Sequence, residues 1–372
     1  MKNNNKNVTF LTCPHQNNLD EYIKNQGFQV ISLPEATLET DKNNTKTWLG
    51  RSQKDDAQYC IKNITRPFDW LIVDHYAIDK TWHQLMRPYC KNLMVIDDLA
   101  NRIYDCDVLL DQTLGREISD YEQLTPRYCQ KLTGQSYTLL RKEFLSNREV
   151  AEKKRKRLIS LPINMHILVS IGGFDPDNIS LLAIKALIQA HKTIKSLKAT
   201  VVLSSKSPFI DSIQTVINDL QWIKLELDSE DMSSLMIKAD LAIGASGATA
   251  WERCSLGLPT ISIEVADNQK LVSQVLTEQG AIINLGSYRD VTEAKITHSL
   301  LTLIKESDNR NSDINFNSPY QTMINNCFDC CDGKGSERVY LRVFNTDVSL
   351  YPATINDLEV VFSWQSNPII RK

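Results

Sequence analysis

The sequence predicts an α/β protein with parallel sheets, on three observations. Short apolar runs alternate with helix-compatible segments along most of the 372 residues, and this pattern is typical of parallel strands joined by helical crossovers. The pattern starts afresh after a charged, helix-prone segment at residues 147–157. The length is sufficient for two domains of ordinary size. We therefore expect two α/β domains, residues 1–150 and 151–345, with a ligand-binding cleft between them.

The first half contains five expected strands. They lie at residues 8–11, 29–33, 69–73, 92–96 and 108–110, and helices are expected near 18–25, before 62 and at 80–90. Polar residues follow three of these strands directly: Asp74, His75 and Tyr76, then Asp97 and Asp98, then Asp111 and Gln112. Because α/β proteins place ligands at the carboxyl ends of parallel strands, this edge is a candidate site.

The second half repeats the alternation. Strands are expected at 167–171, 200–203, 223–227, 241–243 and 260–265, with helices near 180–190, 208–220 and 232–239.

The stretch 239–269 carries the clearest candidate binding site. A short strand leads into the small-residue turn GASGAT, residues 244–249, and a helix is expected from Ala250. Small residues leave backbone N–H groups bare at a helix N-terminus, where they favour an anion. Glu252 is expected in the first helical turn, within reach of a sugar hydroxyl, and Gly257 and Pro259 end the helix. The alternative is an ordinary strand–turn–helix without a ligand.

A second glycine turn, GGFDPDN at residues 172–178, follows the strand at 167–171. The backbone approaches phosphate at turns of this kind. The turn matches neither the GxGxxG fingerprint nor the GxxxxGK[ST] P-loop. It is therefore compatible with an anion site but does not indicate a dinucleotide.

Composition excludes several classes of function. A formal net charge of -3 gives no electrostatic footprint for nucleic acid, and the basic run at 153–157 is expected to be a solvated linker or helix end. No apolar run is long enough for a membrane span, and the N-terminus lacks a signal-peptide core. We expect a cytoplasmic protein.

Nine cysteines are scattered along the chain, and only those in CFDCC, residues 327–331, cluster. A zinc site requires a second pair or nearby histidines, and the sequence offers neither. We expect reduced thiols and no metal site.

Several motifs, taken together, resemble one enzyme family. They are DHY at 74–76, IDD at 96–98 with Arg102, CDVLLDQ at 106–112, LTGQSYTLLRKEF at 132–144, GGFDPDN, GASGATAWERCSLGLP at 244–259, ADNQ at 266–269 and DGKGSERV at 332–339. The combination, over about residues 8–345, is similar to the UDP-2,4-diacetamido-2,4,6-trideoxy-β-L-altropyranose hydrolases of bacterial pseudaminic acid biosynthesis. That family is similar to the peptidoglycan N-acetylglucosaminyltransferase. It has the GT-B fold, two Rossmann-like domains with the nucleotide sugar between them.

The resemblance implies a mechanism and a set of binding residues. Water would replace UDP at the anomeric carbon with inversion, without a metal ion or other cofactor. The diphosphate would lie near Gly172 and Gly173 and near the turn of Ser246, Gly247, Ala248 and Thr249. Glu252 would bond the ribose hydroxyls, and Asn268 with Gln269 would face the sugar or diphosphate. Asp74 and Tyr76 would contact the substrate from the first domain.

His75 is the candidate catalytic residue. The pKa range of histidine suits a general base, and a strand end suits a cleft. The alternative is a histidine whose hydrogen bonds are satisfied at the strand end. His166 lies within an apolar strand and is expected to be structural.

Both ends of the chain differ from the family. Its members begin with a strand and a GxGHxxR loop, whose histidine is the proposed general base, whereas VTFLTCP at 8–14 resembles their second strand. We therefore expect the first sheet to lack a central strand and to expose an edge. Residues 350–372 resemble the opening strand and helix of a GNAT-type acetyltransferase, so 346–372 are expected to be the truncated start of such a domain.

Three functions remain open on the sequence. They are the hydrolase, a UDP-sugar glycosyltransferase of the same fold, and an inactive remnant that binds UDP. Fold alone does not distinguish water from a sugar acceptor, but the DHY, CDVLLDQ and SYTLLRKEF motifs favour the hydrolase. The expected partner is a UDP-sugar substrate, with no nucleic acid and no membrane span.

Overall fold

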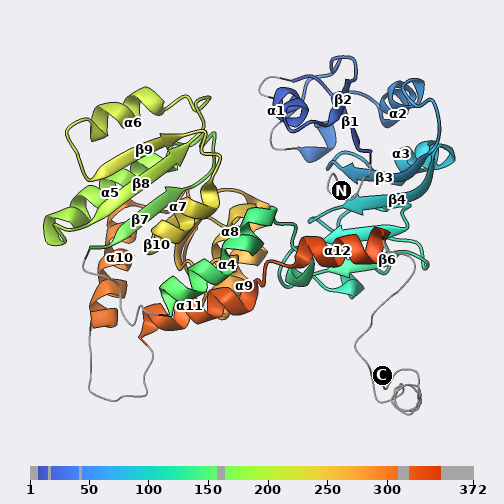
Figure 1. Cartoon of the computed structure of the whole chain (residues 1–372). Helices are drawn as coiled ribbons and strands as arrows, with labels where there is room; N and C mark the ends of the chain where they lie inside the picture. Colours follow the sequence, from blue (N-terminus) through green and yellow to red (C-terminus); the bar gives the residue numbers. More distant parts are fainter. Residues whose placement is uncertain (1–6, 16–17, 42–43, 157–163, 309–317, 345–372) are drawn as a thin grey trace, which may run out of the picture. The chain divides into compact units, whose positions relative to one another are not determined.

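A computed structural model describes residues 7–15, 18–41, 44–156, 164–308 and 318–344 (Figure 1). Residues up to Ser336 form one compact unit, and those from Glu337 onward form another, of which the end of α12 (Gly335–Phe344) is described. The larger unit contains three sheets, and every strand pairing in them is parallel. The predicted α/β class with parallel sheets is therefore confirmed.

The largest sheet has six strands in the order β12-β11-β10-β7-β8-β9. Its strands are β7 (His166–Ser170), β8 (Lys198–Leu203), β9 (Ile223–Leu227), β10 (Leu241–Ala245), β11 (Thr260–Glu264) and β12 (Ile282–Ser287). Its helices are α5 (Ile179–Thr193), α6 (Ile210–Ile217), α7 (Met232–Lys238), α8 (Ala248–Ser255), α9 (Lys270–Glu278), α10 (Glu293–Asp308) and α11 (Pro319–Cys330). Strands β7 and β10 are neighbours, so the loops that follow them share one edge of the sheet.

Both faces of this sheet are covered, as parallel sheets require. Ile167 and Val169 of β7 pack into the core that contains α5 and α10, whereas Leu168, between them, packs against Phe144 of α4 (Lys142–Arg155). This alternation follows from the two-residue period of a strand. The central residues 167–169 of β7 are all apolar, because each face of the strand meets a helix layer.

The first half contains two separate sheets in its described residues. One has the order β3-β4-β5-β6, formed by β3 (Phe68–Asp74), β4 (Cys90–Ile96), β5 (Val108–Asp111) and β6 (Gln130–Thr133). The other pairs β1 (Thr9–Thr12) with β2 (Gln29–Ser32). Among the described residues, β1 pairs with β2 and β3 pairs with β4, and the expected loss of a central strand stays a prediction. Strand β6 was not predicted, because its sequence, QKLT, is mostly polar.

Short helices complete the first half. They are α1 (Asp20–Asn25), α2 (Gln53–Lys62), α3 (Lys80–Met86) and the 3₁₀ turns η2 (Thr45–Thr47), η3 (Arg87–Tyr89), η4 (Ile118–Tyr121) and η5 (Gln135–Tyr137). A further 3₁₀ turn, η6 (Asp267–Gln269), follows β11 in the second half. The core of the first half joins Trp82 and Met86 of α3 to Val73, Leu93 and Leu109 of the sheet.

Helix α8 differs from its prediction at the N-terminus. It starts at Ala248 and not at Ala250, so Glu252 lies in the second turn and not in the first. The earlier start is reasonable because alanine has the highest helix propensity. Thr249 is also anchored in the helix, since its Oγ1 accepts a hydrogen bond of 3.2 Å from Nη1 of Arg253.

The basic run at 153–157 was expected to be a solvated linker or helix end; over its described residues 153–156 the helix end is confirmed, but the run is only partly solvated. Helix α4 ends within it at Arg155, whose side chain is fully buried and donates to the carbonyl oxygens of Met236, Ala239 and Leu256. Lys153 remains exposed. Arg155 is buried because the last carbonyls of a helix such as α7 need donors, and a guanidinium supplies several. The domain division at residue 150 stays a prediction.

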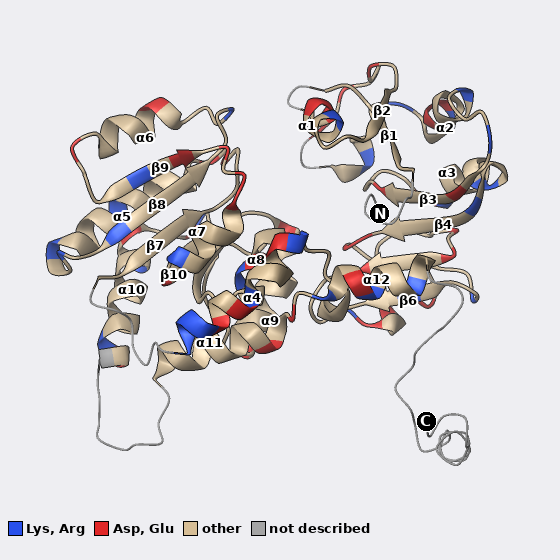
Figure 2. Cartoon of the chain, viewed as in Figure 1, with Lys and Arg blue, Asp and Glu red and all other residues tan. Residues whose placement is uncertain are grey.

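Other predictions from composition can be compared with the described residues. All nine cysteines are free, and eight are buried; no cluster of three or more ligating side chains fits a metal ion in this part of the chain. None of the described helices is long and apolar enough to cross a membrane. Figure 2 shows Lys and Arg interspersed with Asp and Glu over the described elements. The expected acetyltransferase start at 346–372 lies outside the described residues, which end at residue 344.

Candidate functional site

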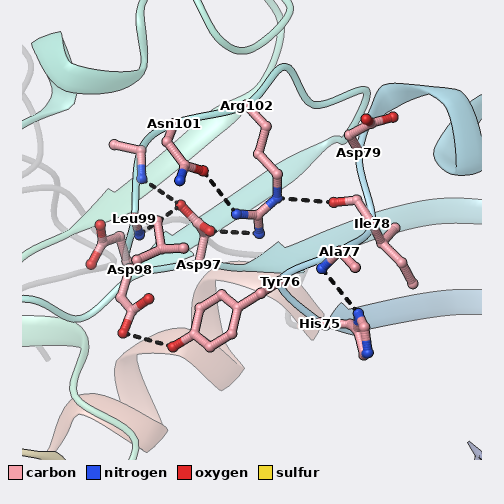
Figure 3. A network of polar contacts seen from close by, with 12 residues as sticks. His75, Tyr76, Ala77, Ile78, Asp79, Asp97, Asp98, Leu99, Asn101 and Arg102 are labelled. Atoms are coloured by element: carbon pink, nitrogen blue, oxygen red, sulfur yellow. Dashed lines mark hydrogen bonds and ion pairs between the residues drawn. The ribbon is translucent and has the colours of Figure 1, made fainter. Parts of the chain in front are cut away.

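The carboxyl ends of β3 and β4 hold a network of acidic and aromatic side chains (Figure 3). Its centre is Asp97, which is buried and receives hydrogen bonds from the backbone N–H groups of Leu99 (3.1 Å) and Ala100 (2.8 Å). Arg102 forms an ion pair of 2.8 Å with the same carboxylate and donates to the carbonyl of Ile78. All of these contacts fix the loop after β4, so Asp97 has a structural role.

Asp98 differs from its neighbour because one of its oxygens is uncommitted. Its Oδ2 accepts hydrogen bonds from the Tyr76 hydroxyl at 3.0 Å and from Nδ2 of Asn268 at 3.2 Å. Its Oδ1 is shielded from solvent and has no hydrogen-bond partner among the described residues. Burial raises the pKa of Asp98, and the bonds from Tyr76 and Asn268 oppose the rise. A buried oxygen without a donor favours a further polar group at this position.

The DHY motif surrounds this carboxylate. Desolvation, followed by the negative charges of Asp98 and Asp97, raises the pKa of Asp74, although its side chain is accessible at the end of β3. Tyr76 donates to Asp98, and burial raises the pKa of its phenol above the usual range. Its ring also meets Trp48 edge-on at 5.6 Å. The predicted residues Asp74 and Tyr76 therefore lie beside Asp98.

His75 is held by the backbone. Its Nδ1 accepts a hydrogen bond of 3.1 Å from the N–H of Ala77 (Figure 3). Burial lowers the pKa of His75, with Asp56 opposing and Arg102 reinforcing this shift. A neutral imidazole that accepts at Nδ1 carries its proton on Nε2. In this arrangement His75 can donate a hydrogen bond from Nε2, but its basic nitrogen is already engaged.

A second aspartate, Asp111, has a structural role at the end of β5. Asp111 is fully buried and accepts from Nε of Arg116 at 2.7 Å. The Tyr121 hydroxyl lies 2.7 Å from both Asp97 and Asp111, and its single proton bonds one of them at a time. The ends of β4 and β5 are thus tied together through Tyr121.

In the second half, the turn between β10 and α8 offers backbone donors. Gly247 is the N-cap of α8 and provides no side-chain cap, and helix geometry leaves the N–H groups of Ala248 and Thr249 without an intrahelical acceptor. Ser246, directly before, is buried and bonds Ser262. The helix dipole and these donors favour an anion.

Gly244 is required by the packing beneath this turn. A Cβ there would lie 2.6 Å from Nη1 of Arg253 and 2.9 Å from the carbonyl oxygen of Ser170. The space it leaves lets the buried Arg253 reach Thr260 at 3.0 Å and the carbonyl of Ala245. The side chain of Arg253 therefore braces the turn from inside the core.

The GGFDPDN loop follows β7, next to β10. Gly172 and Gly173 are exposed, and a Cβ at Gly172 would meet no atom within 4 Å. Asp175 caps α5 by accepting from the N–H groups of Ile179 (3.0 Å) and Ser180 (2.7 Å). The N-terminus of α5 is therefore occupied by a carboxylate of the protein, whereas that of α8 is not.

The remaining predicted residues lie around α8. Gln269 is near the turn, since a Cβ at Gly247 would lie 3.4 Å from its Nε2. Asn268 contacts Asp98, as described above. Glu252 is largely buried and pairs with Nη2 of Arg141 at 3.5 Å. The predicted nucleotide-binding residues thus gather at the carboxyl edge of the six-stranded sheet.

Two functional candidates were not selected from the sequence. Asp98 stood in the IDD motif, but nothing in that motif distinguishes it from Asp97, whose oxygens are all used. Arg141 stood in SYTLLRKEF, 111 residues before its partner Glu252. A contact of that sequence separation has no local signal.

No protein-family model matches the sequence, but three curated proteins are similar to it. Uncharacterized protein MJ1062 of Methanocaldococcus jannaschii is 25% identical over 341 residues, which is 86% of this chain and 62% of that protein. UDP-2,4-diacetamido-2,4,6-trideoxy-beta-L-altropyranose hydrolase of Campylobacter jejuni is 26% identical over 213 residues, 57% of this chain and 72% of that protein. Spore coat polysaccharide biosynthesis protein SpsG of Bacillus subtilis is 30% identical over 121 residues, 32% of this chain and 35% of that protein.

Solved structures resemble the chain over most of its length. Medicago truncatula UGT71G1 complexed with UDP-glucose has a TM-score of 0.57 at 11% identity, covering 92% of both chains. Acinetobacter baumannii MurG has a TM-score of 0.56 at 12% identity, covering 93% of both. The S. aureus MnaA-UDP structure has a TM-score of 0.55 at 12% identity, covering 94% of this chain and 100% of that one. These likenesses show the fold, which consists of two Rossmann-like α/β domains of the GT-B class.

Proposed function

We propose that this chain hydrolyses UDP-2,4-diacetamido-2,4,6-trideoxy-β-L-altrose to UDP and the free sugar, with inversion at the anomeric carbon, as part of pseudaminic acid biosynthesis. The observation that carries the proposal is the uncapped N-terminus of α8 behind Gly247, with Glu252 in the same helix. It is supported by the similarity to the Campylobacter jejuni hydrolase and by the fold shared with structures that contain UDP or UDP-glucose.

The UDP moiety is held by the second half in this proposal. The diphosphate accepts hydrogen bonds from the free N–H groups at Ala248 and Thr249, and Gly172 and Gly173 let it approach the backbone after β7. Glu252 accepts from the ribose hydroxyls, because a carboxylate offers two acceptor oxygens to a diol. The same donors stabilise the charge that develops on the departing UDP.

The acidic network at β3 and β4 supplies the chemistry on the sugar. Substrate binding exposes the unpaired Oδ1 of Asp98 in this proposal, and Oδ1 then takes a proton from water while the water oxygen bonds to the anomeric carbon. The bond from that carbon to the UDP oxygen breaks, and its electron pair leaves with UDP. His75 donates a hydrogen bond from Nε2 to the sugar, and Asn268 and Gln269 orient the reacting group. No step uses a metal ion.

Turnover in water enriched in ¹⁸O tests the reaction. We expect the label in the free sugar and not in UDP, because water attacks carbon, and NMR should show the inverted anomer first. Release of UDP that depends on an added sugar acceptor would instead identify a glycosyltransferase. UDP binding without release would identify a remnant, and either result would refute hydrolysis.

Two aspartate variants test the catalytic assignment. Asp98→Asn should lower kcat by about 10²–10⁴-fold, the usual contribution of a general base. Asp69→Asn is the matched control, because Asp69 stands at the opposite end of β3, is exposed, and pairs with the exposed Lys91. Equal loss of activity in the two variants, or no loss in Asp98→Asn, would contradict the role of Asp98.

A further inference from the structure

Arg141 contacts the carboxylate of Glu252, which is proposed to bind the ribose hydroxyls. Its Nη2 is 3.5 Å from Oε1 of Glu252, and its Nη1 is 3.0 Å from Oε1 of Glu143. Its guanidinium also stacks on the buried ring of Phe144, 5.3 Å from the centroid. Three contacts therefore fix one side chain beside Glu252.

Helix α4, which begins after Arg141, is fixed to helix α8, which contains Glu252. Arg141 is the N-cap of α4, and α4 is bonded to the end of α8 at two places. Arg148 donates to the carbonyl of Ser255 at 2.9 Å, and Arg155 donates to the carbonyl of Leu256 at 2.6 Å. The distance between Arg141 and Glu252 is thus set by packing around α8 itself.

Among the charges around Glu252, Arg141 lowers the pKa of its carboxyl group most strongly. Burial raises the pKa of Glu252, and Arg141 is the strongest influence against that rise. Arg253 also lowers the pKa, although its guanidinium points to Thr260 and Ala245, and Glu143 raises it. Without Arg141, burial and Glu143 would act on the carboxylate with only Arg253 opposing.

We propose that Arg141 is a positioning residue that keeps Glu252 ionised and oriented, and so sets the preference of this site for ribose over deoxyribose nucleotides. The inference rests on the proposed function of the site. An ionised carboxylate accepts from both hydroxyls of a ribose, whereas a protonated one carries a donor and loses part of its acceptor capacity. Arg141 engages Oε1 and leaves Oε2 without a hydrogen bond in the described part of the chain.

The test compares the Kd of UDP with that of 2′-deoxy-UDP between pH 5 and 8, using the full chain. The wild type should prefer UDP by about 10-fold or more, as expected for a hydrogen bond to a charged group. Arg141→Gln should lose most of this preference, first at the acidic end, because protonation of Glu252 then occurs at higher pH. Arg141→Lys should restore it, since the charge is kept.

Two further measurements separate the possible failures. Lys185→Gln is the control variant, because Lys185 is exposed and pairs with Glu293 on the surface; its ratio of the two Kd values should equal that of the wild type. An unchanged ratio in Arg141→Gln overturns the role of Arg141 and leaves the proposed function standing. A wild-type chain that binds neither nucleotide overturns both. Unchanged thermal midpoints in the variants show that they fold.

Discussion

Arg155 should make one of the largest single contributions to the stability of the second half. Its side chain is fully buried at the end of α4. Its Nε donates to Leu256 at 2.6 Å and its Nη2 to Met236 at 2.9 Å. The carbonyl of Ala239 keeps a second donor, Lys154, at 3.2 Å. Substitution by methionine therefore leaves two buried carbonyls without the donor that the structure gives them, at about 1–3 kcal/mol each.

We expect Arg155→Met to lower the free energy of unfolding by about 4 kcal/mol, which is about 2 kcal/mol for each of the two carbonyls. Urea denaturation followed by tryptophan fluorescence measures it, because Trp222 and Trp251 lie in the second half. Lys153→Met is the matched control on the same helix: Lys153 is exposed and pairs with Glu149, so its change should stay below about 0.5 kcal/mol. Equal midpoints for the two variants would refute the assignment of Arg155 as a buried brace.

Three further predictions follow from the same structure. Gly244→Ala should destabilise the chain by about 3 kcal/mol, since the new Cβ meets Arg253 and Ser170, whereas Gly173→Ala makes only an ordinary contact; denaturation midpoints check both. Burial lowers the pKa of His83 to about 4, so the unfolded chain binds a proton below about pH 6.5 that the folded chain refuses. Stability should therefore fall by about 3 kcal/mol from pH 7 to pH 4, and a His83→Gln variant with the same slope would exclude this cause. Because burial raises the pKa of Asp98, and a base acts deprotonated, the acidic limb of kcat/KM should lie above pH 3.9, the ordinary aspartate value; a flat profile down to pH 4 would count against Asp98.

Much of the fold follows from hydrophobic patterning. Strand β9 lies at the predicted residues, and β3, β4, β7 and β8 differ by two residues or fewer at each end. Strands β3, β4, β7 and β8 each contain a run of apolar residues, whereas β9 alternates apolar with charged residues, and local sequence reveals both patterns. The sequence does not predict strand β6, because Gln130 and Lys131 interrupt its apolar pattern. Its pairing with β5 is a tertiary contact without a local sequence signal.

Long-range contacts limited the prediction of the site. The turn after β10 was found because glycine, serine and alanine before a helix have a local meaning. Arg155 was misjudged because a run of basic residues says nothing about which one faces a helix end 81 residues later. Likewise, Asp97 and Asp98 are identical in sequence terms, and only their partners distinguish the structural carboxylate from the available one.

The central claim is that the N-terminus of α8 binds the diphosphate of UDP, and one titration tests it directly. Gly247→Asp would place a carboxylate at the N-cap, where aspartate accepts from the free N–H groups and is at least as favourable to the helix as glycine. The account predicts that wild type and Gly247→Ala bind UDP in calorimetry and that Gly247→Asp folds normally but does not bind. UDP binding to a folded Gly247→Asp chain with wild-type affinity would contradict it.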